Sequence, residues 1–184
     1  MSKEVNSDTS KTHEGWRFFH EGYYAQLPNQ QNMLEDSVRT GKYGQSITLN
    51  ESDFVDKVVM DFGAGSGILS FFAARAGARK VYAIEATPMA ENARTLVEAN
   101  GLSDRIEVVQ EKLEDLELPE KVDVIVSEPM GILLVHERMM EVYAQARKRW
   151  LKPGGKMFPS RGRIFFAPFT DNGLFSNCVN DTRF

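Results

Sequence analysis

Three glycines at alternate positions follow a short apolar run and could form a turn that approaches a ligand closely. The segment reads Asp61-Phe-Gly63-Ala-Gly65-Ser-Gly67 and precedes an apolar, alanine-rich stretch. Glycine has no Cβ, so such a turn can bend tightly and expose its backbone to a bound molecule. Ile68 stands where a dinucleotide-binding G-x-G-x-x-G loop would need its third glycine, and no Gly-Lys-Ser/Thr of a Walker loop follows.

A carboxylate in register with this loop suggests that the ligand is a nucleoside. Glu85 lies 18 residues after Gly67, at the end of the next apolar run. A carboxylate there can accept hydrogen bonds from both hydroxyls of a ribose. Glycine turns and strand-end acids also occur in α/β proteins without ligands. However, strand, loop, helix, strand and acid in this order favour a nucleoside cofactor, and G-x-G-x-G is the form used by methyltransferases that bind S-adenosylmethionine.

Two further carboxylates lie nine residues apart in the segment from Ser127 to Glu137. Glu128 comes at the end of an apolar run, where ligands bind in parallel sheets. A loop of this length can fold back as a hairpin and aim Glu128 and Glu137 into one pocket. Two facing acids repel unless a cation lies between them, and a guanidinium suits such a pair. Alone, Glu137 is better interpreted as a first-turn helix acid, and Glu128 could equally be structural.

The elements that must position these residues alternate between strand and helix. Apolar runs predict strands at 57–61, 80–84, 105–109 and 122–126 and from 156, with helices at 68–76, 87–100 and 137–151 between them. This order predicts an α/β, doubly wound, Rossmann-like parallel sheet. A helical stretch from about Gln30 should precede it and weaken at Gly41. Residues 147–149 are predicted to lie on a solvent-exposed helix face.

The chain divides into four predicted parts. Residues 1–15 are a polar, mobile tail; 16–50 form an N-terminal helical lid; and 51–159 form the cofactor-binding domain. After Pro159 the pattern changes, since 163–167 reads as a strand without a crossover helix and 170–184 completes no element. Residues 160–184 are therefore expected to begin a second domain that this sequence does not complete.

Composition excludes several classes of protein. The 184 residues are 42% hydrophobic and 26% charged, and the net charge is −4. These values are typical of a globular domain, and the acidic balance argues against direct binding of nucleic acid. There is no apolar run long enough to span a membrane. The single cysteine, Cys178, and three histidines lack the spacing of metal ligands, so we expect no metal.

These motifs resemble those of the protein arginine methyltransferases. The similarity lies in the glycine loop, in Val38-Arg-Thr-Gly-Lys-Tyr43 and in Ser127-Glu-Pro-Met-Gly131. Ala167-Pro-Phe-Thr-Asp171 resembles the coactivator-associated, type I branch, and the resemblance covers about residues 18–175. Ile132 departs from the tyrosine usual in the family. The resemblance implies that residues 160–184 begin the family's β-barrel domain, and the rest of that domain, the Thr-His-Trp loop and the dimerisation arm are absent from this sequence.

The resemblance implies a class I S-adenosylmethionine-dependent methyltransferase fold and a role for each matching residue. Arg39 would pair with the carboxylate of the donor, Glu85 with its ribose and Glu114 with its adenine amino group. Glu128 and Glu137 would be the catalytic pair that grips an arginine. Met33 and Met139 would shape the pocket of an asymmetric dimethylator. The implied cofactor contacts are Tyr24, Gln30, Met33, Arg39, Asp61, Gly63, Gly65, Glu85 and Glu114.

The resemblance implies methyl transfer from S-adenosylmethionine to protein arginines, leaving S-adenosylhomocysteine. The substrates would be histones or RNA-binding proteins, in the nucleus and cytoplasm, with no membrane partner. A full-length form would be a homodimer, whereas this chain would be a monomer with little or no activity. Two alternatives remain open: a methyltransferase acting on a nucleic acid or small molecule, and a non-catalytic module that binds S-adenosylmethionine.

Overall fold

A parallel sheet of five strands, in the order β3-β2-β1-β4-β5, organises the protein. The computed structural model describes residues 22–181. The strands are β1 (Val58–Phe62), β2 (Lys80–Ile84), β3 (Ile106–Val109), β4 (Val122–Ser127) and β5 (Leu151–Phe158). The strand order reverses direction between β1 and β4. Ligands bind doubly wound sheets at this switch point, beyond the carboxyl ends of the strands.

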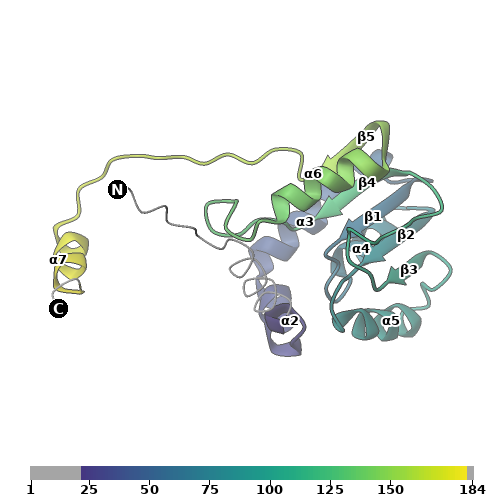
Figure 1. Ribbon diagram of the computed structural model, residues 1–184, viewed down its shortest axis with the longest axis horizontal. Helices are drawn as coiled ribbons and strands as arrows, with labels where there is room; N and C mark the ends of the chain where they lie inside the picture. The colour runs from purple at the N-terminus through teal and green to yellow at the C-terminus, as the bar shows by residue number, and fades with distance from the viewer. Residues whose placement is uncertain (1–21, 182–184) are drawn as a thin grey trace, which may run out of the picture.

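Helices cover both faces of this sheet (Figure 1). In chain order the helices are α2 (Leu27–Glu35), α3 (Ser37–Thr48), α4 (Ile68–Arg75), α5 (Met89–Ala99), α6 (Met139–Trp150) and α7 (Asn172–Asp181), with a 3₁₀ turn at Glu51–Asp53. Of these, α7 lies apart from the sheet. Within the described residues, none of the helices is long and apolar enough to cross a membrane.

Each face of the sheet has its own apolar core, because alternate side chains of a strand point to opposite faces. On one face, α3, α4 and α5 pack Ile47, Leu69 and Val97 against the strands. On the other face, α6 packs Tyr143 and Trp150. The predicted α/β fold is confirmed. Its strands are continuous apolar runs, and such strands need helices on both faces of the sheet to bury their side chains.

The N-terminal helical stretch differs from its prediction. It breaks at Asp36, and Gly41 lies inside α3. The Asp36 carboxylate accepts a hydrogen bond of 2.9 Å from the Arg39 amide, so Asp36 is the N-cap that starts a new helix. The predicted tail at 1–15 and the start of the lid, 16–21, lie outside the described residues.

The C-terminal predictions also need correction. The strand predicted at 163–167 is wrong, since residues 160–171 are exposed and form no regular element, and α7 follows where no element was predicted. A strand needs a neighbouring backbone to pair with, and none of the described strands pairs with this segment. Figure 1 shows it leading away from the sheet to α7. That residues 160–184 begin a β-barrel stays a prediction.

Ile47 is the residue through which α3 is buried in the core, with 0% of its surface exposed. Ile47→Ala should lower the free energy of unfolding by about 2–5 kcal/mol, because it leaves a cavity between α3 and the sheet. Urea denaturation measures this loss. Leu49→Ala is the control, because Leu49 is 82% exposed and its truncation should cost little. Equal losses in the two variants would show that α3 is not held by Ile47.

Candidate functional site

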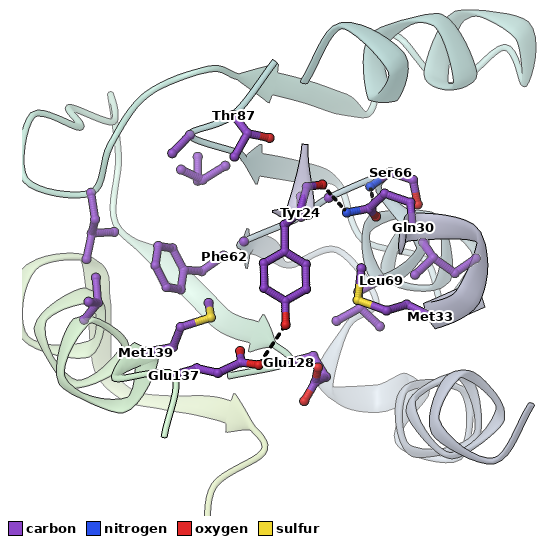
Figure 2. Close-up of a pocket in the computed structure, with 18 of the residues that line it drawn as sticks. Tyr24, Gln30, Met33, Phe62, Ser66, Leu69, Thr87, Glu128, Glu137 and Met139 are labelled. Atoms are coloured by element: carbon purple, nitrogen blue, oxygen red, sulfur yellow. Dashed lines mark hydrogen bonds between the residues drawn. The ribbon is translucent and has the colours of Figure 1, made fainter. Parts of the chain in front are cut away.

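A cavity of about 230 Å³ opens at the carboxyl edge of the sheet, beside the switch point. Its walls come from α2, α3, the glycine loop, the β3–β4 loop and the β4–α6 loop. Figure 2 shows side chains from α2, the glycine loop and the β4–α6 loop turned toward one another. Most of the predicted site residues line this one cavity: Tyr24, Gln30, Met33, Arg39, Gly63, Gly65, Glu114, Glu128 and Glu137. Asp61 and Glu85 are buried and support its wall by hydrogen bonds.

The glycine loop has the backbone conformation that its sequence predicted. Gly63, Gly65 and Gly67 have φ angles of 70°, 56° and 91°, in the region that favours glycine. A Cβ on Gly65 would lie 2.6 Å from Oε1 of Gln30, which shows how closely another element approaches the loop. Glycine at Gly65 therefore serves both the turn and the close contact with α2.

Glu85 holds two backbone segments together. It is 7% exposed, its Oε2 accepts a hydrogen bond from the Gly65 amide at 2.8 Å, and its Oε1 accepts one from the Thr87 amide at 2.8 Å. The glycine loop and the β2–α5 turn are thus fixed by one carboxylate. Each carboxylate oxygen has capacity for a second hydrogen bond, so Glu85 can still accept a hydroxyl from a ligand.

Asp61 joins the end of β1 to α4. Its side chain is fully buried, and its Oδ2 accepts a hydrogen bond of 2.7 Å from the Ser70 hydroxyl on α4. Its Oδ1 has no hydrogen-bond partner among the described residues. Burial raises the pKa of Asp61 to about 7, although the hydrogen bonds from Ser70 lower it.

Tyr24 and Gln30 join the N-terminal helices to the cavity. Gln30 donates from Nε2 to the Tyr24 carbonyl at 2.9 Å and accepts from the Ser66 amide at 3.1 Å. The Tyr24 hydroxyl donates to Oε1 of Glu137 at 2.7 Å, so its ring crosses the cavity (Figure 2). Burial, and then the bond to Glu137, raise the pKa of Tyr24, so the phenol remains a donor.

Arg39 has a protein partner that the sequence did not indicate. Its Nε and Nη2 donate to Oε2 of Glu128 at 3.2 and 2.9 Å, and Nη1 donates to the Met33 carbonyl at 3.3 Å. The ion pair is only partly exposed to solvent: the exposed fraction is 27% for the Arg39 side chain and 21% for the Glu128 side chain. The carboxylate of Glu128 is therefore oriented by a helix that lies 89 residues away in the sequence.

The β4–α6 loop folds back and brings the two glutamates to the same cavity. A bridge joins Gly131 and Leu134, whose amide donates to the Gly131 carbonyl at 2.9 Å. A Cβ on Gly131 would lie 2.5 Å from Cγ of Glu137, so glycine is required there. Glu137 precedes α6 by two residues, so the interpretation as a first-turn helix acid is wrong.

Two contacts at the cavity were not anticipated. The Ser66 amide binds Gln30, and no periodicity in the sequence could have indicated that bond. Arg149 is exposed on its helix face, as the sequence predicted, and it also donates to the carbonyls of the β3–β4 loop. Within residues 22–181 there is no group of three or more acidic, cysteine or histidine residues that could hold a metal ion.

Comparison with known proteins points to one kind of enzyme. A family model described as "Methyltransferase domain" matches residues 59–155. A probable histone-arginine methyltransferase 1.3 of Arabidopsis thaliana is 58% identical over 91% of this chain and 31% of its own length. The histone-arginine methyltransferase CARMER of Drosophila ananassae is 53% identical over 99% of this chain and 34% of its own length.

Solved structures agree with this similarity. The structure of protein arginine methyltransferase 10 of Arabidopsis thaliana has a TM-score of 0.84 and 48% identity, and the match covers 88% of this chain and 46% of that one. The Trypanosoma brucei PRMT1 enzyme-prozyme complex with AdoHcy has a TM-score of 0.72 and 44% identity, over 74% of this chain and 43% of that one. The chain spans about a third of the length of the curated relatives described above.

The raised pKa of Asp61 predicts a specific pH dependence of stability. The usual pKa is 3.8, so between about pH 4 and pH 7 the folded protein keeps a proton that the unfolded chain has lost. Stability should therefore fall as the pH rises through this window. Asp61→Asn keeps an oxygen for Ser70 and should remove this part of the slope.

Urea denaturation from about pH 4 to pH 8 measures the slope for each variant. Asp104→Asn, at an exposed position, is the matched control and should leave the slope unchanged. If Asp61→Asn and the unmodified protein show the same slope, the proton is not held by Asp61.

Proposed function

The chain belongs to the methyltransferase-domain family, and we propose that it binds S-adenosylmethionine in the cavity beside the glycine loop. We further propose that it is the cofactor-binding part of a protein arginine methyltransferase. The observation that carries this proposal is that Glu128 and Glu137 line the same cavity as Gly63 and Gly65. A cofactor loop and a pair of carboxylates are thereby brought within reach of one bound molecule.

The residues at the glycine-loop side of the cavity fit a nucleoside cofactor. Glu85 is buried beneath the loop with acceptor capacity left for ribose hydroxyls. Glu114 lines the cavity from the β3–β4 loop, where it can accept the adenine amino group. Arg39 borders the cavity with a guanidinium that can pair with the donor's carboxylate. Tyr24, Gln30 and Met33 also line the cavity as proposed contacts, whereas the predicted contact Asp61 is buried and can act only through the wall. The proposal includes no metal.

The two glutamates supply what arginine chemistry needs. A guanidinium stays protonated throughout the physiological pH range, and its delocalised lone pairs make the nitrogens poor nucleophiles. Glu128 and Glu137 would accept its N–H groups and hold the positive charge on the nitrogens they contact. The remaining nitrogen then regains lone-pair character and is aimed at the donor.

Orientation and electrostatics account for the rest of the proposed step. The bound donor supplies an electrophilic methyl group and leaves as S-adenosylhomocysteine. Glu128 and Glu137 offset the repulsion between the guanidinium and the sulfonium. Tyr24 fixes Oε1 of Glu137, and Arg39 fixes Oε2 of Glu128. The nitrogen that receives the methyl group loses its proton during or after transfer, so no strong base is required.

The relatives' names favour a protein substrate in the nucleus. Several are called histone-arginine methyltransferases, so we propose arginine-containing proteins such as histones as substrates. Met33 and Met139, which both line the cavity, suit asymmetric dimethylation. RNA-binding proteins as further substrates, a cytoplasmic pool and a homodimer of a longer form also belong to this proposal. Calorimetric titration with S-adenosylhomocysteine, followed by radiolabel transfer to a histone peptide, tests both halves of the proposal.

Glu85→Ala should weaken the binding of S-adenosylhomocysteine by about 1.5–3 kcal/mol, roughly ten- to a hundred-fold, because the ribose loses a charged acceptor. Calorimetry gives the affinity, and circular dichroism shows whether the variant is folded. Glu91→Ala, on an exposed part of α5, is the control and should bind normally. Unchanged affinity in folded Glu85→Ala would remove Glu85 from the proposed ribose site.

Glu128→Gln separates cofactor binding from transfer. In a form of the protein as long as its curated relatives, the variant should bind S-adenosylhomocysteine within about threefold of the unmodified protein, because the amide oxygen can still accept from Arg39. Methyl transfer should fall by at least about a hundred-fold, roughly 2.7 kcal/mol in barrier height. Transfer that survives within about threefold would mean that the charge of Glu128 is not needed.

A further inference from the structure

The connection between β3 and β4 forms part of the cavity wall, although it contains no helix. Residues 110–121 form turns and irregular backbone, whereas the other connections on the sheet contain α-helices. Leu113 and Leu116 are 3% and 0% exposed, so their side chains anchor the loop in the core. The carbonyls of Leu113 and Leu116 are partly buried, and a carbonyl shielded from water needs a donor because leaving it unpaired costs free energy.

Arg149, in the last turn of α6, supplies those donors. Its Nη1 donates to the carbonyls of Leu113 and Glu114 at 2.9 and 3.1 Å, and its Nη2 donates to the carbonyl of Leu116 at 3.0 Å. Its Cζ lies 4.2 Å from the ring centre of Trp150, which is itself buried in the core. The guanidinium is therefore held on one side by an aromatic face and at its edge by three carbonyls.

The loop that Arg149 holds is the loop that reaches the cofactor cavity. Leu113 and Glu114 line that cavity, and both of their carbonyls accept from the same Nη1. We propose that Arg149 is a positioning residue that fixes Glu114 against the base of the cofactor and so sets the selectivity for adenine. The inference rests on the proposed function, because only a bound adenosyl group gives Glu114 a base to recognise.

This arrangement of contacts requires the side chain of an arginine. A guanidinium presents several N–H groups in a rigid plane, whereas an ammonium is a point charge on a flexible stem. One lysine could not span the carbonyls at residues 113, 114 and 116 while lying flat on the Trp150 ring. Lysine at this position should therefore recover only part of the function.

The experiment compares two ligands that differ at the base. The adenine of S-adenosylhomocysteine has an amino group that can donate a hydrogen bond to Glu114. S-inosylhomocysteine has a carbonyl in place of this amino group. We expect Arg149→Met to reduce the ratio of the two affinities at least five-fold, with Arg149→Lys intermediate. Lys148→Met, the neighbouring cation on α6, is the matched control and should keep the ratio. A variant that is only less stable would lose affinity for both ligands equally and would overturn the proposal.

A double variant tests whether Arg149 acts through Glu114. In Glu114→Gln, replacement of Arg149 by Met should change the affinity ratio by less than twofold, because the group being positioned is no longer a carboxylate. A full five-fold change in that background would overturn the proposed route. If the unmodified protein does not bind S-adenosylhomocysteine, the proposed function is refuted. If it binds normally and Arg149→Met leaves the affinity ratio unchanged, only the role of Arg149 is refuted.

Discussion

The hydrogen bond from the Gly65 amide to the Glu85 carboxylate joins the ends of β1 and β2, and the cavity depends on it. A parallel sheet brings its carboxyl ends to one edge, but it does not fix the loops that leave them. Glu85 fixes two of those loops, since it also accepts from Thr87. The bond is buried, where competition from water is weak and a charged acceptor is strong. The α2 wall of the cavity is placed on the glycine loop in turn, because the Ser66 amide donates to Gln30.

The two N-terminal helices are attached differently: α2 is attached by polar contacts, whereas α3 is attached by the apolar packing of Ile47. The buried residue of α2 is Gln30 and that of α3 is Ile47, while Leu27 and Val38 face outward at 60% and 71% exposure. Gln30 binds the glycine loop and Tyr24 binds Glu137. Such an attachment is directional, because hydrogen bonds specify an orientation that an apolar contact does not. The position of the N-terminal lid therefore depends on the positions of both the glycine loop and the β4–α6 loop.

The sequence predicted the parts of this site that follow from strand ends. The glycine loop, Glu85 and Glu128 each come directly after an apolar run, so the parallel sheet necessarily brings them to one edge. It could not predict the bonds of Arg39 to Glu128 or Arg149 to Leu113, because they join distant segments and leave no periodic pattern. The strand expected at 163–167 failed for a related reason, since strand formation depends on a partner that local sequence does not reveal.

The ion pair of Arg39 with Glu128 has the same chemistry as the complex that Glu128 would form with a substrate. In both, a guanidinium donates to the same carboxylate. The protein thus carries its own intramolecular competitor for that position, held at a high effective concentration by α3. A substrate arginine must either share Glu128 through Oε1 or displace Arg39 from Oε2. A donor whose carboxylate draws Arg39 toward itself favours the second course, so the charge at one end of the cofactor would regulate access for the second ligand.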